Sequence, residues 1–235
     1  MITSADNRIK VCAVIAAAGS GSRMGGVSKP NIKLLGKTLF EYVLDAITAS
    51  FIDEAVVVCS NDNIESLREI AHDFKKPIKF VLGGKMRAES VRNGIDASSD
   101  DIDIICVHDC ARPFVTKEIF EETVVAAIDS GASCVCSPVT DTLKHRNPET
   151  NEISTPNRND LFAVQTPQCF KKSVYLDAVK QAEEIYSDFT DETSLLEHFG
   201  VKVNYTVRTE PNMKLTSVAD VAVAEAIMNQ IESSR

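Results

Sequence analysis

The stretch AAAGSGSRMGG, residues 16–26, follows the apolar residues 11–15 and contains the first side chains suited to chemistry. Glycines let a backbone approach a phosphate chain closely, so that its N–H groups can bind phosphate oxygens. Arg23 could clamp two such oxygens, and Lys29 could add a mobile positive charge. The pattern favours a triphosphate-binding loop, and the alternative is an ordinary glycine-rich turn with two solvated cations.

Two well-known phosphate loops do not fit this stretch. A P-loop needs the spacing G-x-x-x-x-G-K-[ST], and no Lys-Ser or Lys-Thr follows a glycine at that distance here. The dinucleotide fingerprint would begin at Gly19 and Gly21, but Met24 occupies the position of its third glycine. NAD binding is therefore disfavoured.

Carboxylate and cationic side chains recur further along the chain. Asp109 ends an apolar run, where a buried carboxylate is costly without a partner, so it is a candidate ligand for a metal or a hydroxyl group. The alternative is a simple ion pair with Arg112. Lys214, taken by itself, reads as a surface lysine near the end of a strand.

Short β-branched runs alternate with segments of helical periodicity, which predicts a mainly parallel sheet covered by helices on both faces. Predicted strands cover residues 10–15, 55–60, 78–82, 102–108, 132–139 and 201–207. Predicted helices cover residues 40–47, the segment from an N-cap at Thr116 to Gly131, and residues 174–185, 191–199 and 218–231.

Ligands of open parallel sheets bind beyond the carboxyl ends of the strands. Four segments that leave predicted strands carry residues suited to phosphate, nucleotide or metal. These segments are residues 16–26, 83–85, 109–112 and 140–142.

Composition limits the kinds of partner. The 235 residues have a net charge of -9, which argues against a broad nucleic-acid interface, because such surfaces are basic. The seven cysteines are odd in number and lie mostly in apolar runs, so we expect reduced core residues and no zinc site. The sequence lacks an apolar run of membrane-spanning length and a secretory signal, so we expect a cytoplasmic protein.

One polar stretch interrupts this pattern. Residues 144–160 contain turn signals at Asn147-Pro148 and Thr150-Asn151 and too little apolar surface to fold alone. We expect a single domain over residues 1–235 with a hairpin arm over residues 143–161 that packs against a neighbour. A floppy loop is the alternative.

Seven blocks of the sequence, in order, resemble the 2-C-methyl-D-erythritol 4-phosphate cytidylyltransferase family of the non-mevalonate isoprenoid pathway. The resemblance implies a Rossmann-like nucleotidyltransferase fold, and a reaction in which CTP and the sugar-alcohol phosphate combine with Mg²⁺ and release pyrophosphate. The blocks are AAAGSGSRMGG…SK, LGGKMRAESVRNG, VHDCARPF, SPVTDTLK, TPNRNDLFAVQTPQ, TDETSLLEHFG and PNMKLT.

The resemblance also implies roles for individual residues. Arg23, Lys29 and Lys214 would neutralise charge on the triphosphate, and Asp109 would contact the sugar alcohol near the metal. Implied nucleotide contacts are Ala17, Ala18, Gly19, Gly83, Gly84 and Ser90. Implied substrate contacts are Asp109, Arg112, Thr142, Arg158, Thr166 and Thr190. Since the family's arm reaches into a partner subunit, the resemblance implies a homodimer with exchanged arms.

Two positions depart from the family's usual pattern. Ser28-Lys29-Pro30 replaces Pro-Lys-Gln, and Pro30 should bias Lys29 toward extended geometry. Lys85 stands where small or acidic residues are common, and would add a cation near the nucleotide or point to water. Two rival functions remain: a ribitol 5-phosphate cytidylyltransferase with the same scaffold, and a catalytically silent nucleotide-binding module.

Overall fold

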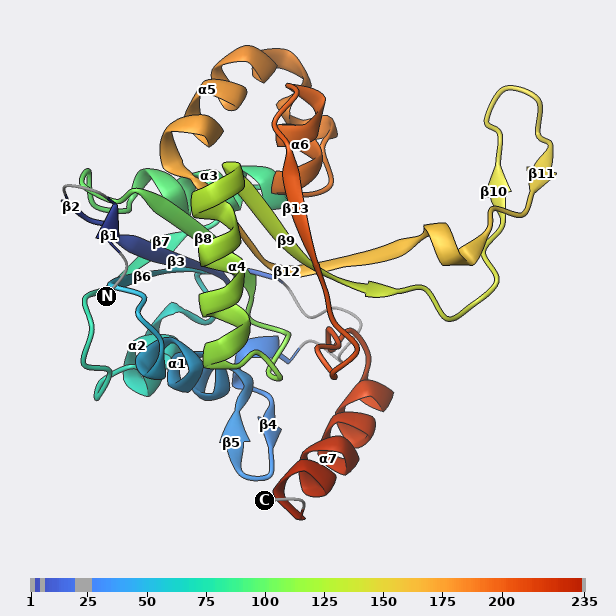
Figure 1. Ribbon diagram of the computed structural model, residues 1–235. Helices are drawn as coiled ribbons and strands as arrows, with labels where there is room; N and C mark the ends of the chain where they lie inside the picture. The colour runs from blue at the N-terminus through green and yellow to red at the C-terminus, as the bar shows by residue number, and fades with distance from the viewer. Residues whose placement is uncertain (1–2, 5–6, 20–26, 234–235) are drawn as a thin grey trace.

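A seven-stranded sheet forms the centre of the protein, in a computed structural model that describes residues 3–4, 7–19 and 27–233 (Figure 1). The strand order is β13–β9–β12–β8–β3–β6–β7. β12 runs antiparallel to β8 and β9, and the other pairs are parallel, which confirms the predicted mainly parallel sheet. The strands are β3 (Val11–Ala16), β6 (Glu54–Cys59), β7 (Ile78–Leu82), β8 (Ile104–Asp109), β9 (Ala132–Pro138), β12 (Phe162–Lys171) and β13 (Val203–Val207).

Helices cover both faces of this sheet. Side chains of α1, α2 and α4 pack with one apolar cluster, and those of α3, α5 and α6 pack with another. These helices are α1 (Leu39–Ala49), α2 (Ile64–Ile70), α3 (Arg87–Asp96), α4 (Lys117–Ser130), α5 (Lys172–Ala182) and α6 (Glu192–His198). The C-terminal α7 (Val218–Ser233) packs with a third, smaller cluster that includes Leu34 and Phe114.

The central strand β3 shows why two apolar layers form. Its side chains alternate between the faces of the sheet, so Ala13 and Ile15 enter the cluster under α1, whereas Cys12 and Val14 enter the cluster under α3. All four are buried. A strand that is apolar at every position is therefore buried on both sides, as expected for a parallel sheet.

Helix α4 begins and ends where the sequence predicts. The Thr116 hydroxyl accepts a hydrogen bond from the Ile119 N–H, and Gly131 takes φ +95° at the end of the helix. Helix α1 has a full capping box, in which Thr38 and Glu41 satisfy each other's backbone N–H groups.

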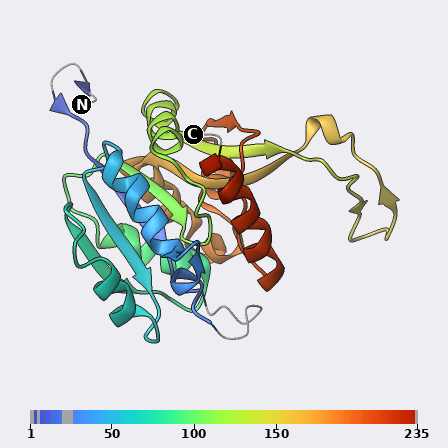
Figure 2. The same cartoon turned by 90° about the horizontal axis from the view of Figure 1, so that it is seen from below.

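Three short antiparallel pairs lie outside the central sheet. The pairs are β1 (Thr3–Ser4) with β2 (Asn7–Arg8), β4 (Lys33–Leu34) with β5 (Lys37–Thr38), and β10 (His145–Arg146) with β11 (Ile153–Ser154). β10 and β11 lie at the end of the ribbon formed by β9 and β12 and extend away from the sheet in both views (Figure 1, Figure 2). The role of residues 143–161 as a dimerisation arm remains a prediction. The assignment of the whole chain to a single domain also remains a prediction.

β12, α2, α3 and the short pairs β1–β2 and β4–β5 were not predicted from the sequence. β12 contains Gln165-Thr166-Pro167-Gln168, and a proline within a run argues against a strand. The structure accommodates it with a register shift between Val164 and Gln168 and a cis peptide bond before Pro167. The ends of the predicted strands and helices agree with the structure to within three residues. The largest difference is at the helix predicted over residues 174–185, which ends at Ala182 and continues as the 3₁₀ segment η4 (Glu183–Asp188). Within the described chain, none of the helices is long and apolar enough to span a membrane.

Candidate active site

A cavity of about 440 Å³ lies beyond the carboxyl ends of β3, β6, β7 and β8. It is the place where an open parallel sheet binds its ligand. Three of the four predicted segments reach it, and the fourth, residues 140–142, leaves β9 on the far side of β12. The predicted site residues that line the cavity are Ala17, Ala18, Gly19, Lys29, Gly84, Ser90, Asp109 and Lys214.

The β3 end of the cavity is fixed by backbone hydrogen bonds. Ala17 N–H donates to Val58 O at 2.9 Å, and Cys110 N–H donates to Ala16 O at 3.1 Å. Asn63, which the sequence analysis did not single out, is buried and its amide donates to Ala17 O and to the Ser28 hydroxyl. The start of the glycine-rich loop is therefore held from two sides.

Steric crowding explains why glycine occupies both position 83 and position 84. A Cβ on Gly83 would lie 2.8 Å from both Ala18 Cβ and Ser90 Oγ, and a Cβ on Gly84 would lie 2.4 Å from Glu89 Cβ. Without side chains, the Gly84 N–H donates to Ser90 Oγ at 3.0 Å. The pair thus brings the end of β7 against α3 and against the loop after β3, although Gly83 itself does not line the cavity.

Asp109 is the electrostatic centre of the site. Its carboxylate lies 2.7 Å from Lys214 Nζ, 3.7 Å from Arg87 Nη2 and 3.8 Å from Arg112 Nε. Burial opposes ionisation, but Lys214 and the two guanidinium groups outweigh it and hold the pKa of Asp109 below its usual value. Asp109 is therefore a charged carboxylate surrounded by three cations.

Arg87 and Glu192 were missed as site residues. Arg87 donates to the two oxygens of Glu192 at 2.7 and 3.0 Å, and both residues are the first of their helices, α3 and α6. Burial opposes charge on Arg87, but Glu192 and Asp109 outweigh it and raise the pKa of the guanidinium. The pair joins the start of α3 to the start of α6. Arg87 belongs to the block LGGKMRAESVRNG and Glu192 to the block TDETSLLEHFG, but no local sequence pattern connects residues so far apart.

Lys214 is carried by a loop that is bonded to the Asp109 loop. Leu215 N–H donates to Ala111 O at 2.8 Å, and Arg112 Nη1 donates to Asn212 O at 2.7 Å. Arg112 is buried and does not line the cavity. Its visible function is to fix the Lys214 loop.

Thr166 and His108 lie buried beneath Asp109. Thr166 Oγ1 accepts from the Asp109 N–H at 3.0 Å and lies 3.1 Å from His108 Nδ1. His108 Nε2 lies 3.2 Å from Arg112 O. Burial lowers the pKa of His108 to about 4.

The remaining predicted residues lie apart from the cavity. Thr142 is exposed in the arm, Arg158 is exposed and donates to Thr140 O at 3.2 Å, and Thr190 is exposed two residues before Glu192. Arg23 lies outside the described residues. Thr142, Arg158 and Thr190 are therefore not among the residues that line the cavity.

The expectation of extended geometry at Lys29 is wrong. Lys29 begins the 3₁₀ segment η2 (Lys29–Asn31), and the extended residue is Ser28. Ile32 N–H donates to Lys29 O at 3.0 Å, and Asn31 N–H donates to Ser28 O. Pro30 fits because its missing N–H is not needed at the start of this turn. Lys85 is exposed and lines the cavity. The structure is therefore compatible with a cation near the nucleotide and with a side chain that points to water.

Among the described residues, no group of three or more His, Cys, Asp or Glu side chains could hold an ion. The seven cysteines are free and buried, which confirms that they are core residues.

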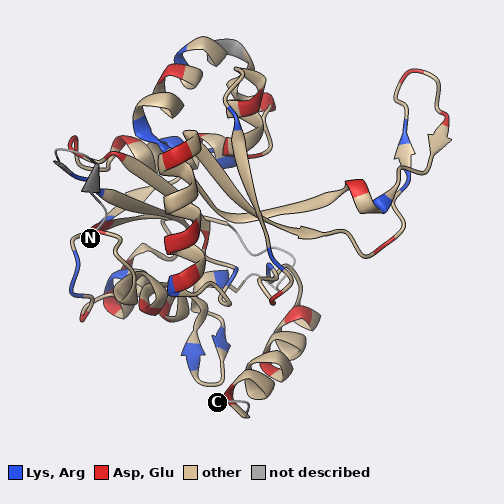
Figure 3. Ribbon diagram, in the orientation of Figure 1, with Lys and Arg blue, Asp and Glu red and all other residues tan. Residues whose placement is uncertain are grey.

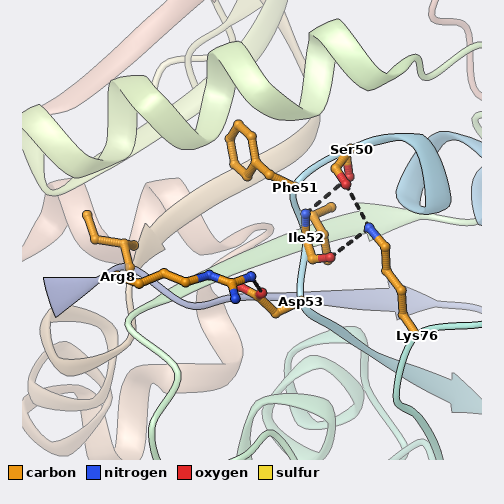
Figure 4. A pocket seen from close by; sticks show the side chains of 7 residues that line it. Arg8, Ser50, Phe51, Ile52, Asp53 and Lys76 are labelled. Carbon is orange, nitrogen blue, oxygen red and sulfur yellow. Dashed lines mark hydrogen bonds and ion pairs between the residues drawn. The ribbon is translucent and has the colours of Figure 1, made fainter. Parts of the chain in front are cut away.

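A second hollow, of about 310 Å³, lies beside the residues that lead into β3 and β6 (Figure 4). Lys76 Nζ donates there to the carbonyls of Ile47, Ser50 and Ile52 at 2.7 to 2.8 Å, and Arg8 pairs with Asp53. Lys76 therefore caps the C-terminal end of α1, and the charged groups in this hollow have a structural role.

An α/β sheet with glycines and cations gathered beyond its strand ends is an architecture shared with solved nucleotidyltransferases, which gives the class of this protein. The family model of 2-C-methyl-D-erythritol 4-phosphate cytidylyltransferase, IspD, matches residues 11–230. The chain belongs to this family.

Relatives and solved structures agree with the assignment. A protein of Clostridium botulinum named 2-C-methyl-D-erythritol 4-phosphate cytidylyltransferase is 37% identical over 93% of this chain and 97% of its own. A crystal structure of 4-diphosphocytidyl-2C-methyl-D-erythritol synthase from Anaerococcus prevotii has a TM-score of 0.84 at 28% identity, over 94% and 96% of the two chains. The cytidylyltransferase from Thermus thermophilus gives 0.74 at 27% identity, over 94% and 100%.

Proposed function

We propose that the protein joins CTP and 2-C-methyl-D-erythritol 4-phosphate, giving 4-diphosphocytidyl-2-C-methyl-D-erythritol and pyrophosphate. The observation that carries the proposal is the meeting of Lys214 with the ionised Asp109 in the cavity bordered by Gly19 and Gly84. A buried carboxylate that holds a lysine at the strand ends is suited to a substrate with both phosphate and hydroxyl groups.

The reaction is in-line attack of the sugar-alcohol phosphate on the α-phosphorus of CTP, with pyrophosphate as the leaving group. Such a transfer depends on positioning and on neutralising charge in the transition state. Lys29 and Lys214 line the cavity, and we assign this role to them and to Arg23. Asp109 would release Lys214 to the phosphates and turn to a hydroxyl of the acceptor.

The nucleotide would lie between the ends of β3 and β7. Close contacts at Gly83 and Gly84 support backbone recognition there, because side chains at these positions would collide with Ser90 and Glu89. We propose Ala17, Ala18, Gly19, Gly83, Gly84 and Ser90 as its contacts.

The sugar-alcohol phosphate would contact Asp109, Thr142, Arg158 and Thr190. We assign Arg112 to fixing the loop of Lys214, since it is buried and donates to Asn212 O. Thr142 and Arg158 lie on the arm and would act in the site of a partner subunit.

Mg²⁺ fits this site only together with the nucleotide. Asp109 offers one carboxylate, and three cationic side chains already surround it. Their positive charge disfavours binding of a metal ion by Asp109 alone. Magnesium commonly uses one or two carboxylates with substrate phosphates and water, and it supplies neutralisation of phosphate charge. Asp109 is the described residue that would contribute a ligand.

A homodimer with exchanged arms would complete the site. Apolar side chains on the arm and its ribbon are exposed, including Ile153 at 69% and Phe162 at 48%. Such a surface on a two-stranded extension favours cover by a second copy. The proposed dimer therefore accounts for both the apolar arm and the distance of Arg158 from the cavity.

We place the protein in the cytoplasm, without nucleic-acid or membrane partners. Seven buried thiols suit a reducing compartment. The net charge is -9, and α4 and α7 present acidic residues on the visible face (Figure 3).

Thermal unfolding with CTP, combined with pyrophosphate detection, tests the proposal against a silent nucleotide-binding module. CTP at about 100 times its Kd should stabilise the fold by roughly 2.7 kcal/mol, and addition of the acceptor with Mg²⁺ should release pyrophosphate. Stabilisation without turnover would favour the silent module.

A further inference from the structure

His108 and Thr166 form a buried hydrogen-bonded chain whose direction can be worked out. The backbone N–H of Asp109 can only donate, so Thr166 Oγ1 accepts that bond at 3.0 Å. The backbone oxygen of Arg112 can only accept, so His108 Nε2, at 3.2 Å, must carry a proton.

The remaining contact joins Thr166 Oγ1 to His108 Nδ1 at 3.1 Å. His108 is fully buried and edge-packed on Phe120, with a ring centroid distance of 5.3 Å, and its ring nitrogens contact no carboxylate through any described hydrogen bond. A neutral imidazole is favoured in such surroundings. Its Nδ1 is then an acceptor, and the Thr166 hydroxyl must be the donor.

We propose that the Nε2–H tautomer of His108 and the hydroxyl of Thr166 act as a positioning relay beneath Asp109 and Arg112. The relay consists of these two side chains alone. The Thr166 hydroxyl proton is committed to His108, so Thr166 acts on the reaction through Asp109 and does not donate to the substrate.

The relay fixes both ends of one short turn. Arg112 N–H donates to Asp109 O at 3.0 Å, Thr166 holds the Asp109 N–H, and His108 holds the Arg112 carbonyl. Asp109 in turn contacts Lys214, and Arg112 fixes Asn212 in the Lys214 loop. The polar atoms of the relay itself, the two ring nitrogens of His108 and Thr166 Oγ1, are all hydrogen-bonded, and a buried network satisfied in this way specifies the position of its members.

NMR of the full-length protein labelled with ¹⁵N-histidine tests the direction of the chain without any turnover. Two-bond ¹H–¹⁵N correlations at neutral pH should show His108 neutral with its proton on Nε2, assigned by loss of the signals in His108→Leu. A proton on Nδ1 would overturn the proposal, because the Thr166 hydroxyl would then be free to donate to a ligand. This readout stands apart from the proposed function, on which only the kinetic test rests.

Kinetics of a double-mutant cycle test the positioning role. Thr166→Val and His108→Leu should each lower kcat/KM by roughly 10- to 100-fold, and the double variant should lie within about threefold of the worse single variant, because all three break one chain. Thr166→Ser should recover most of the loss. Effects that multiply in the double variant would refute the relay.

Thr123→Val is the matched control. Thr123 is fully buried and its hydroxyl donates to Ile119 O inside α4, outside the relay. Its kinetics should match the wild type. A loss equal to that of Thr166→Val would attribute the effect to removal of any buried hydroxyl and would overturn the proposal.

Discussion

Lys214 Nζ lies 2.7 Å from Asp109 Oδ2, and this contact joins two loops separated by more than 100 residues in sequence. Leu215 N–H, bonded to Ala111 O, fixes the same two loops through their backbones. The lysine is therefore held at the carboxyl ends of the strands before a phosphate arrives. Such preorganised charge is the largest single contribution in many transfers of this kind.

Removal of this lysine should affect turnover more than folding. Lys214→Ala should lower kcat by about 10²–10³-fold, because it removes charge neutralisation in the transition state. Steady-state pyrophosphate release measures the effect, and thermal unfolding checks the fold. Lys180→Ala is the control, since Lys180 is an exposed lysine on α5 that pairs with Asp177 at 3.5 Å. Near-normal turnover of Lys214→Ala would remove this residue from the mechanism.

The buried fork between Arg87 and Glu192 should matter most when only one partner is removed. Glu192→Gln should lower the free energy of unfolding by roughly 2–4 kcal/mol, discounted because the Arg87 side chain is 32% exposed. Replacing both residues by methionine should cost less, since no buried charge is then left alone. Urea unfolding measures both variants. A double variant less stable than Glu192→Gln would contradict this account.

His108 should make stability fall on mild acidification. Its pKa is lowered from 6.5 to about 4, so between these values the unfolded chain binds a proton that the folded chain does not. At 1.36 kcal/mol for each pKa unit, roughly 3 kcal/mol should be lost as the pH drops from about 6.5 to about 4.

Urea unfolding at several pH values measures this loss. His108→Leu lacks the titrating group and should lose correspondingly less over the same range. Equal slopes for the two proteins would show that His108 does not titrate as described.

Exchange of arms predicts complementation between damaged subunits. Lys214→Ala and Arg158→Ala should each be poorly active alone, but mixed dimers would contain one site with both residues intact. Random pairing of equal amounts should restore about a quarter of wild-type sites, because half of the dimers are mixed and one of their two sites is intact. Activity after mixing and subunit exchange measures this. Mixtures no more active than their components would place Arg158 in its own subunit's site.

The sequence predicts the parallel part of the fold well and the antiparallel strand poorly. Buried parallel strands are apolar throughout, as in β3 and β8, and such runs are distinct in any sequence. β12 escaped prediction because Pro167 and three polar residues interrupt its centre, where the structure places the bend next to Thr166. Only the tertiary fold shows that this bend supports the site.

The site was predicted where a residue lies beside a strand end and missed where two distant elements meet. Asp109 and Gly84 each lie within two residues of the end of an apolar run, so position alone indicated them. Arg87 and Glu192 lie 105 residues apart on two helices, and only packing brings them together. His108 was predicted as the last residue of an apolar strand, and it lies one residue before the end of β8, but its partner Thr166 comes from β12.

The most direct test of the central claim is pyrophosphate release from CTP and Mg²⁺ with 2-C-methyl-D-erythritol 4-phosphate. Parallel reactions would contain ribitol 5-phosphate or no acceptor, and mass spectrometry would identify the CDP-alcohol. We expect release and a CDP-methylerythritol product with the first acceptor alone. Release with ribitol 5-phosphate alone, or with neither acceptor, would contradict the assignment.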